Sequence, residues 1–295
     1  MALDLATLKQ RAGTALIFVA VMLTGLFWNS LSFFILFSII HFGAWSEYQK
    51  LQGKIDPAYQ AISGFHKIGV RIAGWSVMLF FANELPFVQF DLSTVAIGVS
   101  ILFFFILPII EILFSGKLNQ HVIGRSVLGI LYISLCMGLI IDLYPMISVQ
   151  TQGSLYTLMP AGLVIWVIAS IWINDTMAYL IGSQFGRTPL SPSSPKKTWE
   201  GTLGGVICTV IVMGLYAYFK MQWGTASWLL MGASAIAAAV GTYGDLLESK
   251  FKRLAGVKDS GNIMPGHGGF LDRFDSLLLA IPAIWIYVHL WAFFL

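Results

Sequence analysis

Long apolar runs separated by short polar segments dominate the sequence, and about nine of them approach the ~17–25 residues that a helix needs to cross a bilayer. We expect membrane-spanning helices at residues 14–28, 31–47, 69–82, 94–114, 126–141, 158–181, 201–219, 226–244 and 276–294. The limits of the runs at 69–82 and 201–219 are the least distinct. The pattern predicts an all-α fold, that of a polytopic integral membrane protein with about nine transmembrane helices.

Composition agrees with this class. Hydrophobic residues make up 57% of the chain, charged residues only 11%, and the mean hydropathy is +0.80, whereas soluble domains carry roughly 25% charged residues. Cys136 and Cys208 lie inside apolar runs, which favours packing residues over a disulfide or a metal pair. The first twelve residues are polar and precede no small-residue cleavage site, so we expect no cleavable signal sequence.

The positions of the basic residues predict the orientation. With nine spans, all 17 lysines and arginines except Lys220 fall on one side, and the positive-inside rule assigns that side to the cytoplasm. We therefore expect a multi-pass protein of the cell (inner) membrane with its active site facing the cytoplasm. Residues 1–150 are interpreted as scaffold helices and residues 151–295 as a catalytic domain, with cytoplasmic motif loops at 186–200 and 245–275. Glu47 and Glu111 lie at expected span ends, where an interfacial position is the simplest interpretation.

The segment 244–276 is the most polar stretch of the chain and mixes acids, bases and glycines. Asp245, Glu248, Ser249 and Lys252 are spaced to share one face of a helix, as are Asp272 and Asp275. The run Pro265-Gly266-His267-Gly268-Gly269 between them cannot be regular helix, and its glycines allow backbone N–H groups to approach a ligand. We therefore expect a helix end, a glycine loop and a helix start that bring carboxylates together around a polyphosphate and its metal ions.

A second group of polar residues lies upstream. Asp175, next to Asn174, falls inside an apolar helix, where an acid faces a polar cavity or serves as a structural partner for a base. Ser194-Pro195 resembles a helix N-cap, which would put Lys196 and Lys197 in the first helical turn as a phosphate clamp. Ordinary cytoplasmic flanking charge explains the two lysines equally well. Gly201 and Gly205 form a pattern typical of close helix packing.

These motifs resemble the bacterial phosphatidate cytidylyltransferases, or CDP-diacylglycerol synthases. The resemblance rests on the run from Ser249 to Arg253, Lys258-Asp259-Ser260-Gly261, the run from Pro265 to Asp275, the run from Ser194 to Gly201, and Asn174-Asp175. It covers roughly residues 172–276. It implies CTP and phosphatidate as substrates, CDP-diacylglycerol and pyrophosphate as products, Mg²⁺ with a second cation such as K⁺, and a homodimer. No nucleic-acid partner is expected.

The chemistry of such a reaction, in which metal ions must neutralise the triphosphate, suggests roles for individual residues. Asp245, Asp272 and Asp275 are expected to bind metal, joined by Asp175 and Glu248. The expected phosphate ligands are Lys196, Lys197, Lys252, Arg253, Lys258 and Arg273. The expected hydrogen-bond donors are Ser194, Thr198, Ser249 and His267. Gly266, Gly268 and Gly269 are expected to allow close approach of the backbone to substrate.

Two other functions and a purely topological role are alternatives to this one. A CTP-dependent lipid-alcohol kinase of similar architecture would release CDP rather than pyrophosphate. A transporter is disfavoured because transporter sites tend to lie near mid-membrane, whereas these motifs fall at one face. A solvated loop whose charges only set the membrane topology would need basic residues alone. That interpretation leaves Asp245, Asp272 and Asp275 unexplained.

Overall fold

The computed structural model describes residues 5–86, 88, 91–115, 119–145, 148–151, 154–157, 159–221, 224–262 and 268–294. The chain divides into two compact units. Unit 1 consists of Met1–Asp142 and Phe251–Arg273, and unit 2 of Leu143–Lys250 and Phe274–Leu295. The polar segment 251–273 therefore packs with the N-terminal helices, which a simple division at residue 150 does not foresee. The assignment of scaffold and catalytic roles to the two parts stays a prediction.

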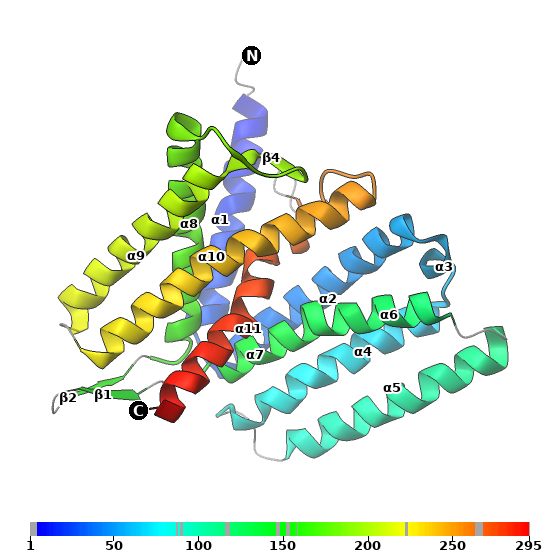
Figure 1. Ribbon diagram of the computed structural model, residues 1–295. Helices are drawn as coiled ribbons and strands as arrows, with labels where there is room; N and C mark the ends of the chain where they lie inside the picture. The colour runs from blue at the N-terminus through cyan, green and yellow to red at the C-terminus, as the bar shows by residue number, and fades with distance from the viewer. Residues whose placement is uncertain are drawn as a thin grey trace. The chain divides into compact units, whose positions relative to one another are not determined.

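Unit 1 is helical (Figure 1). In chain order it contains α1 (Leu5–Phe27), α2 (Ser30–Ile55), α3 (Pro57–Gln60), α4 (Gly64–Phe81), the 3₁₀-helix η1 (Ala82–Glu84), α5 (Leu92–Ser115), α6 (Gln120–Gly129), the π-helical segment η2 (Ile130–Leu135) and α7 (Cys136–Asp142). The last residues of α10 and the first residues of α11 complete it.

Unit 2 combines four helices with two short antiparallel hairpins. Its elements are β1 (Ser148–Thr151), β2 (Ser154–Thr157), α8 (Gly162–Phe185), β3 (Pro189–Ser191), β4 (Ser194–Thr198), α9 (Trp199–Met221), α10 (Thr225–Leu254) and α11 (Leu271–Phe294). In the second hairpin Pro189 lies opposite Thr198 and Ser191 opposite Ser194. The two hairpins are the sheets of the described part of the chain.

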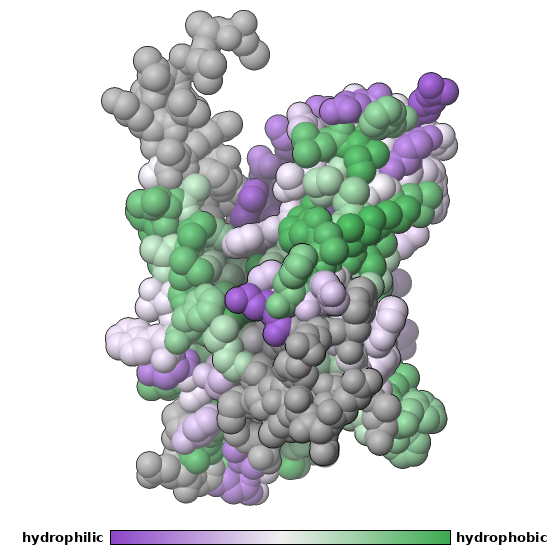
Figure 2. Space-filling view, turned by 90° about the vertical axis from the view of Figure 1, so that its left-hand side faces the viewer, coloured by the Kyte–Doolittle hydropathy of each residue, from purple (hydrophilic) through white to green (hydrophobic). Residues whose placement is uncertain are grey.

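Each of the nine predicted spans coincides with helix, although the fifth is shared among α6, η2 and α7. Seven helices in the described ranges are long and apolar enough to cross a membrane. The apolar part of α1, Gly13–Phe27, is shorter, and α4 is not among the seven. Figure 2 shows broad apolar areas on the face in view, and many large apolar side chains are exposed, as expected where side chains contact lipid. The predicted all-α polytopic membrane fold is confirmed.

Helix α2 forms the centre of unit 1. Its aromatic side chains Phe33, Phe37, Trp45 and Tyr48 are fully buried. The indole Nε1 of Trp45 donates to Ser134 Oγ at 2.8 Å, and His41 Nε2 lies 2.9 Å from the same hydroxyl. Ser134 belongs to η2, so the π-helical turn supplies the polar partner that these buried side chains need.

In unit 2, helices α8 and α9 lie side by side (Figure 1) because glycine allows their backbones to approach. A Cβ at Gly201 would lie 2.7 Å from the carbonyl oxygen of Ala178, and one at Gly205 would lie 2.8 Å from Asn174 Oδ1. Real Cβ atoms do not come this close to other heavy atoms. The close packing predicted for Gly201 and Gly205 is therefore confirmed.

Small residues also allow α10 to pack tightly. Ala233, Ala237 and Ala238 are fully buried. Across this contact Trp166 Nε1 on α8 donates to Ser234 Oγ at 2.7 Å. The Trp166 indole is thus paired with α10, which fixes the rotation of α10 and hence the direction of its acidic side chains.

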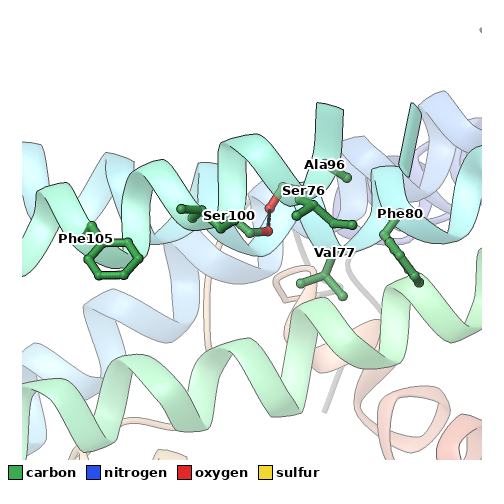
Figure 3. A pocket seen from close by; sticks show the side chains of 8 residues that line it. Ser76, Val77, Phe80, Ala96, Ser100 and Phe105 are labelled. Atoms are coloured by element: carbon green, nitrogen blue, oxygen red, sulfur yellow. Dashed lines mark hydrogen bonds between the residues drawn. The ribbon is translucent and has the colours of Figure 1, made fainter. Parts of the chain in front are cut away.

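A cavity of about 390 Å³ lies in unit 1. Figure 3 shows its walls, which come from α4 and α5 and are mainly apolar. The hydroxyls of Ser76 and Ser100 form a 2.6 Å hydrogen bond with each other beside the apolar side chains Val77, Phe80 and Phe105. The two hydroxyls bond to each other, and none of the residues that line this cavity is charged.

Candidate active site

Three carboxylates gather in unit 2. Asp245 and Glu248 on α10 and Asp275 on α11 each offer a ligand oxygen, and these oxygens all lie within 4.8 Å of one another. Glu248 is fully buried and Asp275 is 9% exposed. Among the residues that the structure describes, this acid cluster is the group with the spacing of a metal site.

The local sequence explains how the acid cluster forms. Asp245 and Glu248 are one helical turn apart on α10, as their spacing predicted. Asp275 comes from the start of α11, whose backbone meets α10 at Gly244. A Cβ at Gly244 would lie 3.0 Å from the Cα of Ser276 and closer still to the carbonyl oxygen of Asp275. The missing side chain at residue 244 therefore lets the two helices bring their acids together.

A lysine and a fourth acid lie near this cluster. Lys197 Nζ on β4 forms an ion pair with Asp245 Oδ2, and both side chains are partly buried. Asp175 on α8 interacts electrostatically with Lys197 and with Asp245. Ser249 Oγ donates to Asp245 Oδ1 at 3.4 Å. The structure thus brings together six of the predicted site residues around one patch of negative charge.

The position of Lys197 corrects one prediction. Ser194 is not a helix N-cap, and Lys196 and Lys197 do not lie in a first helical turn, because residues 194–198 form strand β4. Helix α9 begins at Trp199, and Thr198 Oγ1 accepts the Gly201 N–H at 3.2 Å. The capping hydroxyl is therefore four residues further along than predicted. The strand extends the two lysines away from α9 instead of placing them on its dipole.

The β3–β4 hairpin is fixed to α9 by Glu200. The Glu200 carboxylate accepts the backbone N–H groups of Arg187 and Thr188, each at 3.1 Å, and the Thr188 hydroxyl at 2.8 Å. An acid in the first turn of a helix is also favoured by the helix dipole. These bonds hold the start of the hairpin and so determine where the hairpin presents Lys197.

A second polar cluster lies in unit 1 around Asp272, in the first turn of α11. Lys252 Nζ lies 2.6 Å from Asp272 Oδ1, and the two side chains are only 12% and 7% exposed. Asp272 Oδ2 accepts the N–H and the hydroxyl of Ser260, both at 2.9 Å, and the N–H of Gly269 at 2.8 Å. Asp272 thus closes the loop between α10 and α11 by binding both of its described ends.

Glu47 is the residue of this second cluster that sequence reasoning missed. The interpretation of Glu47 as an interfacial side chain is wrong, because it is 1% exposed. Its carboxylate accepts the Ser260 hydroxyl and the backbone N–H groups of Phe270 and Leu271, each at 2.9 Å. Its partners lie more than 200 residues away in the chain, so no local pattern reveals them. The only signal in the sequence was an acid at the end of an expected span.

The remaining predicted residues fall into four groups. Exposed bases are Lys196, Arg253, Lys258 and Arg273. Gly268 has φ +80°, a left-handed conformation that glycine adopts without strain, and a Cβ there would lie 2.6 Å from Asp272 Oδ2. Gly266 and His267 lie outside the described residues, so their predicted roles have no structural account. Ser194 is half-buried in β4.

The acid cluster fits a hard divalent cation. Three carboxylates at this spacing repel one another, and two of them are buried, so the arrangement is costly unless positive charge is near. Lys197 supplies one such charge. Carboxylate oxygens are the ligands that Mg²⁺ prefers, together with water and substrate phosphates. The same reasoning does not extend directly to Asp272, whose two oxygens already accept hydrogen bonds from Lys252, Ser260 and Gly269.

Comparison with known proteins identifies the family. The model of the cytidylyltransferase family matches residues 9–291. The chain belongs to this family. Proteins named phosphatidate cytidylyltransferase are similar to part of it: the one from Staphylococcus aureus strain COL is 45% identical over 122 residues, that from Staphylococcus haemolyticus 44% over 122, and that from Staphylococcus epidermidis 42% over 125. Each match spans 41% of this chain and 46% of the relative, about half the length of the curated relatives.

Proposed function

We propose that this member of the cytidylyltransferase family transfers CMP from CTP to phosphatidate, giving CDP-diacylglycerol and pyrophosphate. The observation that carries the proposal is the acid cluster of Asp245, Glu248 and Asp275 with Lys197 paired to it. Acids and a lysine in one partly buried patch suit a polyphosphate that arrives with its metal ions. The partial similarity to proteins named phosphatidate cytidylyltransferase supports the choice of lipid substrate.

Asp245, Glu248 and Asp275 would hold Mg²⁺, with Asp175 and Asp272 as further ligands predicted from the sequence and K⁺ as a second cation. When bound, the metal would supply positive charge to neutralise the triphosphate. Lys197 and its neighbour Lys196 would meet phosphate oxygens from β4. The exposed bases Arg253, Lys258 and Arg273, the hydroxyls of Ser194, Thr198 and Ser249, and the loop residues Gly266, His267, Gly268 and Gly269 complete the proposed binding set.

The reaction requires little proton transfer by these residues. A phosphate oxygen of phosphatidate attacks the α-phosphorus of CTP. The bond from that phosphorus to the oxygen bridging to the β-phosphate breaks, and pyrophosphate leaves with the electron pair. Because the nucleophile is already an anion, no strong general base is required, and the barrier lies mainly in charge repulsion and alignment. Lys197 would supply positive charge to these anions, and its carboxylate partner Asp245 orients its ammonium group. Lys252, also predicted as a phosphate ligand, is oriented in unit 1 by Asp272.

The decisive experiment follows the label from CTP. Purified protein in detergent is incubated with Mg²⁺, phosphatidate and CTP labelled at the α-phosphate, and the lipids are extracted. We expect label in the lipid fraction and one pyrophosphate for each CDP-lipid. Asp245→Asn serves as the inactive control. If label instead stays in water-soluble CDP while the γ-phosphate enters lipid, the protein is a lipid kinase, and the proposal is wrong.

The proposal also includes a site on the cytoplasmic side of the membrane and a protein that forms a homodimer. The distribution of lysines and arginines supports the orientation. A single cysteine at Asn262, an exposed residue, should react with an impermeant maleimide only from the cytoplasmic side. A cysteine at Met159, which is 57% exposed, should react only from outside. Both variants replace Cys136 and Cys208 by alanine, and labelling of residue 262 from outside would refute the orientation.

A further inference from the structure

We propose that Glu47 is a positioning residue for cytidylyl transfer, which holds Asp272 and the first turn of α11 in place. This inference rests on the proposed function. Glu47 lies in α2, within the N-terminal helices to which the sequence assigned only a scaffold role. All the contacts that carry the inference lie within unit 1.

The Glu47 carboxylate is shared among three donors of the polar segment 251–273. Its Oε1 accepts the Phe270 N–H at 2.9 Å, and its Oε2 accepts the Leu271 N–H and the Ser260 hydroxyl, both at 2.9 Å. Leu271 is the first residue of α11, so Glu47 satisfies amides at a helix N-terminus, where a negative charge is favoured. A side chain of α2 therefore accepts the two amides at the start of α11, while Asp272 of α11 itself accepts the Gly269 N–H just before them.

Ser260 links Glu47 to Asp272. Its hydroxyl oxygen lies 2.9 Å from Glu47 Oε2 and 2.9 Å from Asp272 Oδ2. A hydroxyl has one proton, so it donates to one of these carboxylates at a time, while the Ser260 N–H stays directed at Asp272. The placement of Asp272, and through it that of Lys252, thus depends on the charge and position of Glu47.

The surrounding glycines show that the segment is fitted to this carboxylate. A Cβ at Gly261 or Gly269 would collide with the Glu47 carboxylate. One helical turn before Glu47, Gly43 makes room for the ring of Phe270. One face of α2 therefore binds Phe270 in two ways. Gly43 leaves space for the Phe270 ring, and the Glu47 carboxylate accepts the Phe270 N–H.

The test is the isosteric variant Glu47→Gln. A carboxylate only accepts hydrogen bonds, and both oxygens of Glu47 face donors. A glutamine amide has an oxygen at one end and an NH₂ group, which only donates, at the other. In one orientation the NH₂ group would face the Phe270 N–H, and in the other it would face the Leu271 N–H and the Ser260 hydroxyl, so at least one backbone N–H loses its acceptor. We expect hydrogen exchange of the Phe270 and Leu271 amides to accelerate at least tenfold, followed in peptides that cover residues 268–272. We also expect kcat per folded protein to fall at least tenfold and the Mg²⁺ concentration for half-maximal activity to rise.

The matched control is Asp91→Asn in the same unit. Asp91 also caps a helix, since its Oδ1 accepts the N–H groups of Ser93 and Thr94 at the start of α5. This variant should leave kcat and the Mg²⁺ requirement unchanged. If Glu47→Gln does not purify in folded form, Ser260→Ala replaces it, because this change removes only the hydroxyl between the two carboxylates. It too should raise the Mg²⁺ requirement.

Unchanged amide exchange at 268–272 in a folded Glu47→Gln protein would overturn the proposal. So would a loss of activity that follows only the folded fraction, with the Mg²⁺ requirement unaltered in both variants. If the wild-type protein makes no CDP-lipid, the proposed function fails. The exchange experiment still decides whether Glu47 holds the segment, because it needs no turnover.

Discussion

Lys197 on β4 and Asp245 on α10 form an ion pair that joins the β3–β4 hairpin to the acid cluster of unit 2. The pair couples a base that the sequence predicted as a phosphate ligand to an acid that it predicted as a metal ligand. Because both side chains are partly exposed, the pair itself contributes little to the stability of the fold. Its importance lies in orienting the lysine and in offsetting the repulsion among the acids.

Lys197→Ala should weaken substrate binding more than it lowers turnover. We expect the KM for CTP or for phosphatidate to rise about tenfold, which corresponds to about 1.4 kcal/mol of binding free energy. Steady-state kinetics with each substrate varied in turn would measure it. Lys220→Ala, in the last turn of α9, is the control and should leave both KM values unchanged. Equal KM values for the two variants would mean that Lys197 does not bind substrate and only contributes to membrane topology.

Glu248→Gln should uncouple stability from Mg²⁺. In EDTA the variant should unfold at a higher temperature than the wild type, because it removes one of three mutually repelling, largely buried carboxylates. Added Mg²⁺ should stabilise the wild type by about 2.7 kcal/mol at a hundred times its Kd, and the variant much less. Thermal unfolding with and without the metal is the measurement. An equal response to Mg²⁺ in both proteins would show that the cluster does not bind it.

Asp272→Asn should lower stability as well as activity. The ion pair between Lys252 and Asp272 is largely buried, and loss of one partner from a buried pair costs about 3–5 kcal/mol. Lys252→Met combined with Asp272→Asn should cost less than the sum of the single changes, because no buried charge is then left without its partner. Denaturant unfolding of the four proteins gives the coupling free energy. Additive costs would mean that the two side chains do not interact in solution.

Gly244→Ala should disrupt the acid cluster without touching an acid. Its new Cβ would meet the backbone of Asp275 and Ser276, and overpacking of this kind costs about 1–3 kcal/mol. Activity should fall at least tenfold because Asp275 moves away from Asp245. Gly241→Ala is the matched control on the same helix, since its Cβ would find only ordinary contacts at 3.5 Å or more. Equal activities of the two variants would contradict the account of how α10 and α11 meet.

The sequence predicted the features that depend on nearby residues. Apolar runs located the helices, and the spacing of Asp245 and Glu248 placed both on one face of α10. The spacing of Gly201 and Gly205 predicted close helix packing, which the structure shows between α8 and α9. Each of these features follows from the spacing of residues along one helix, so it can be predicted from a short stretch of sequence.

Features that depend on tertiary contacts were missed. Ser194-Pro195 carries a good capping signal, but pairing of β3 with β4 and the bonds to Glu200 moved the start of α9 to Trp199. Glu47 has the same local setting as any acid at the end of a span. Its role appears only once Ser260 and the amides at the start of α11 are seen around it.

The Glu47 contact also has a consequence for biogenesis. The amide of Phe270 is synthesised 223 residues after its acceptor, which at 5–20 residues per second is a delay of roughly 10–45 s. Throughout that interval α2 carries an acid whose final donors do not yet exist. Nascent chains arrested before residue 260 should therefore lack all three partners of the Glu47 carboxylate, and the two backbone donors appear only when the start of α11 is synthesised.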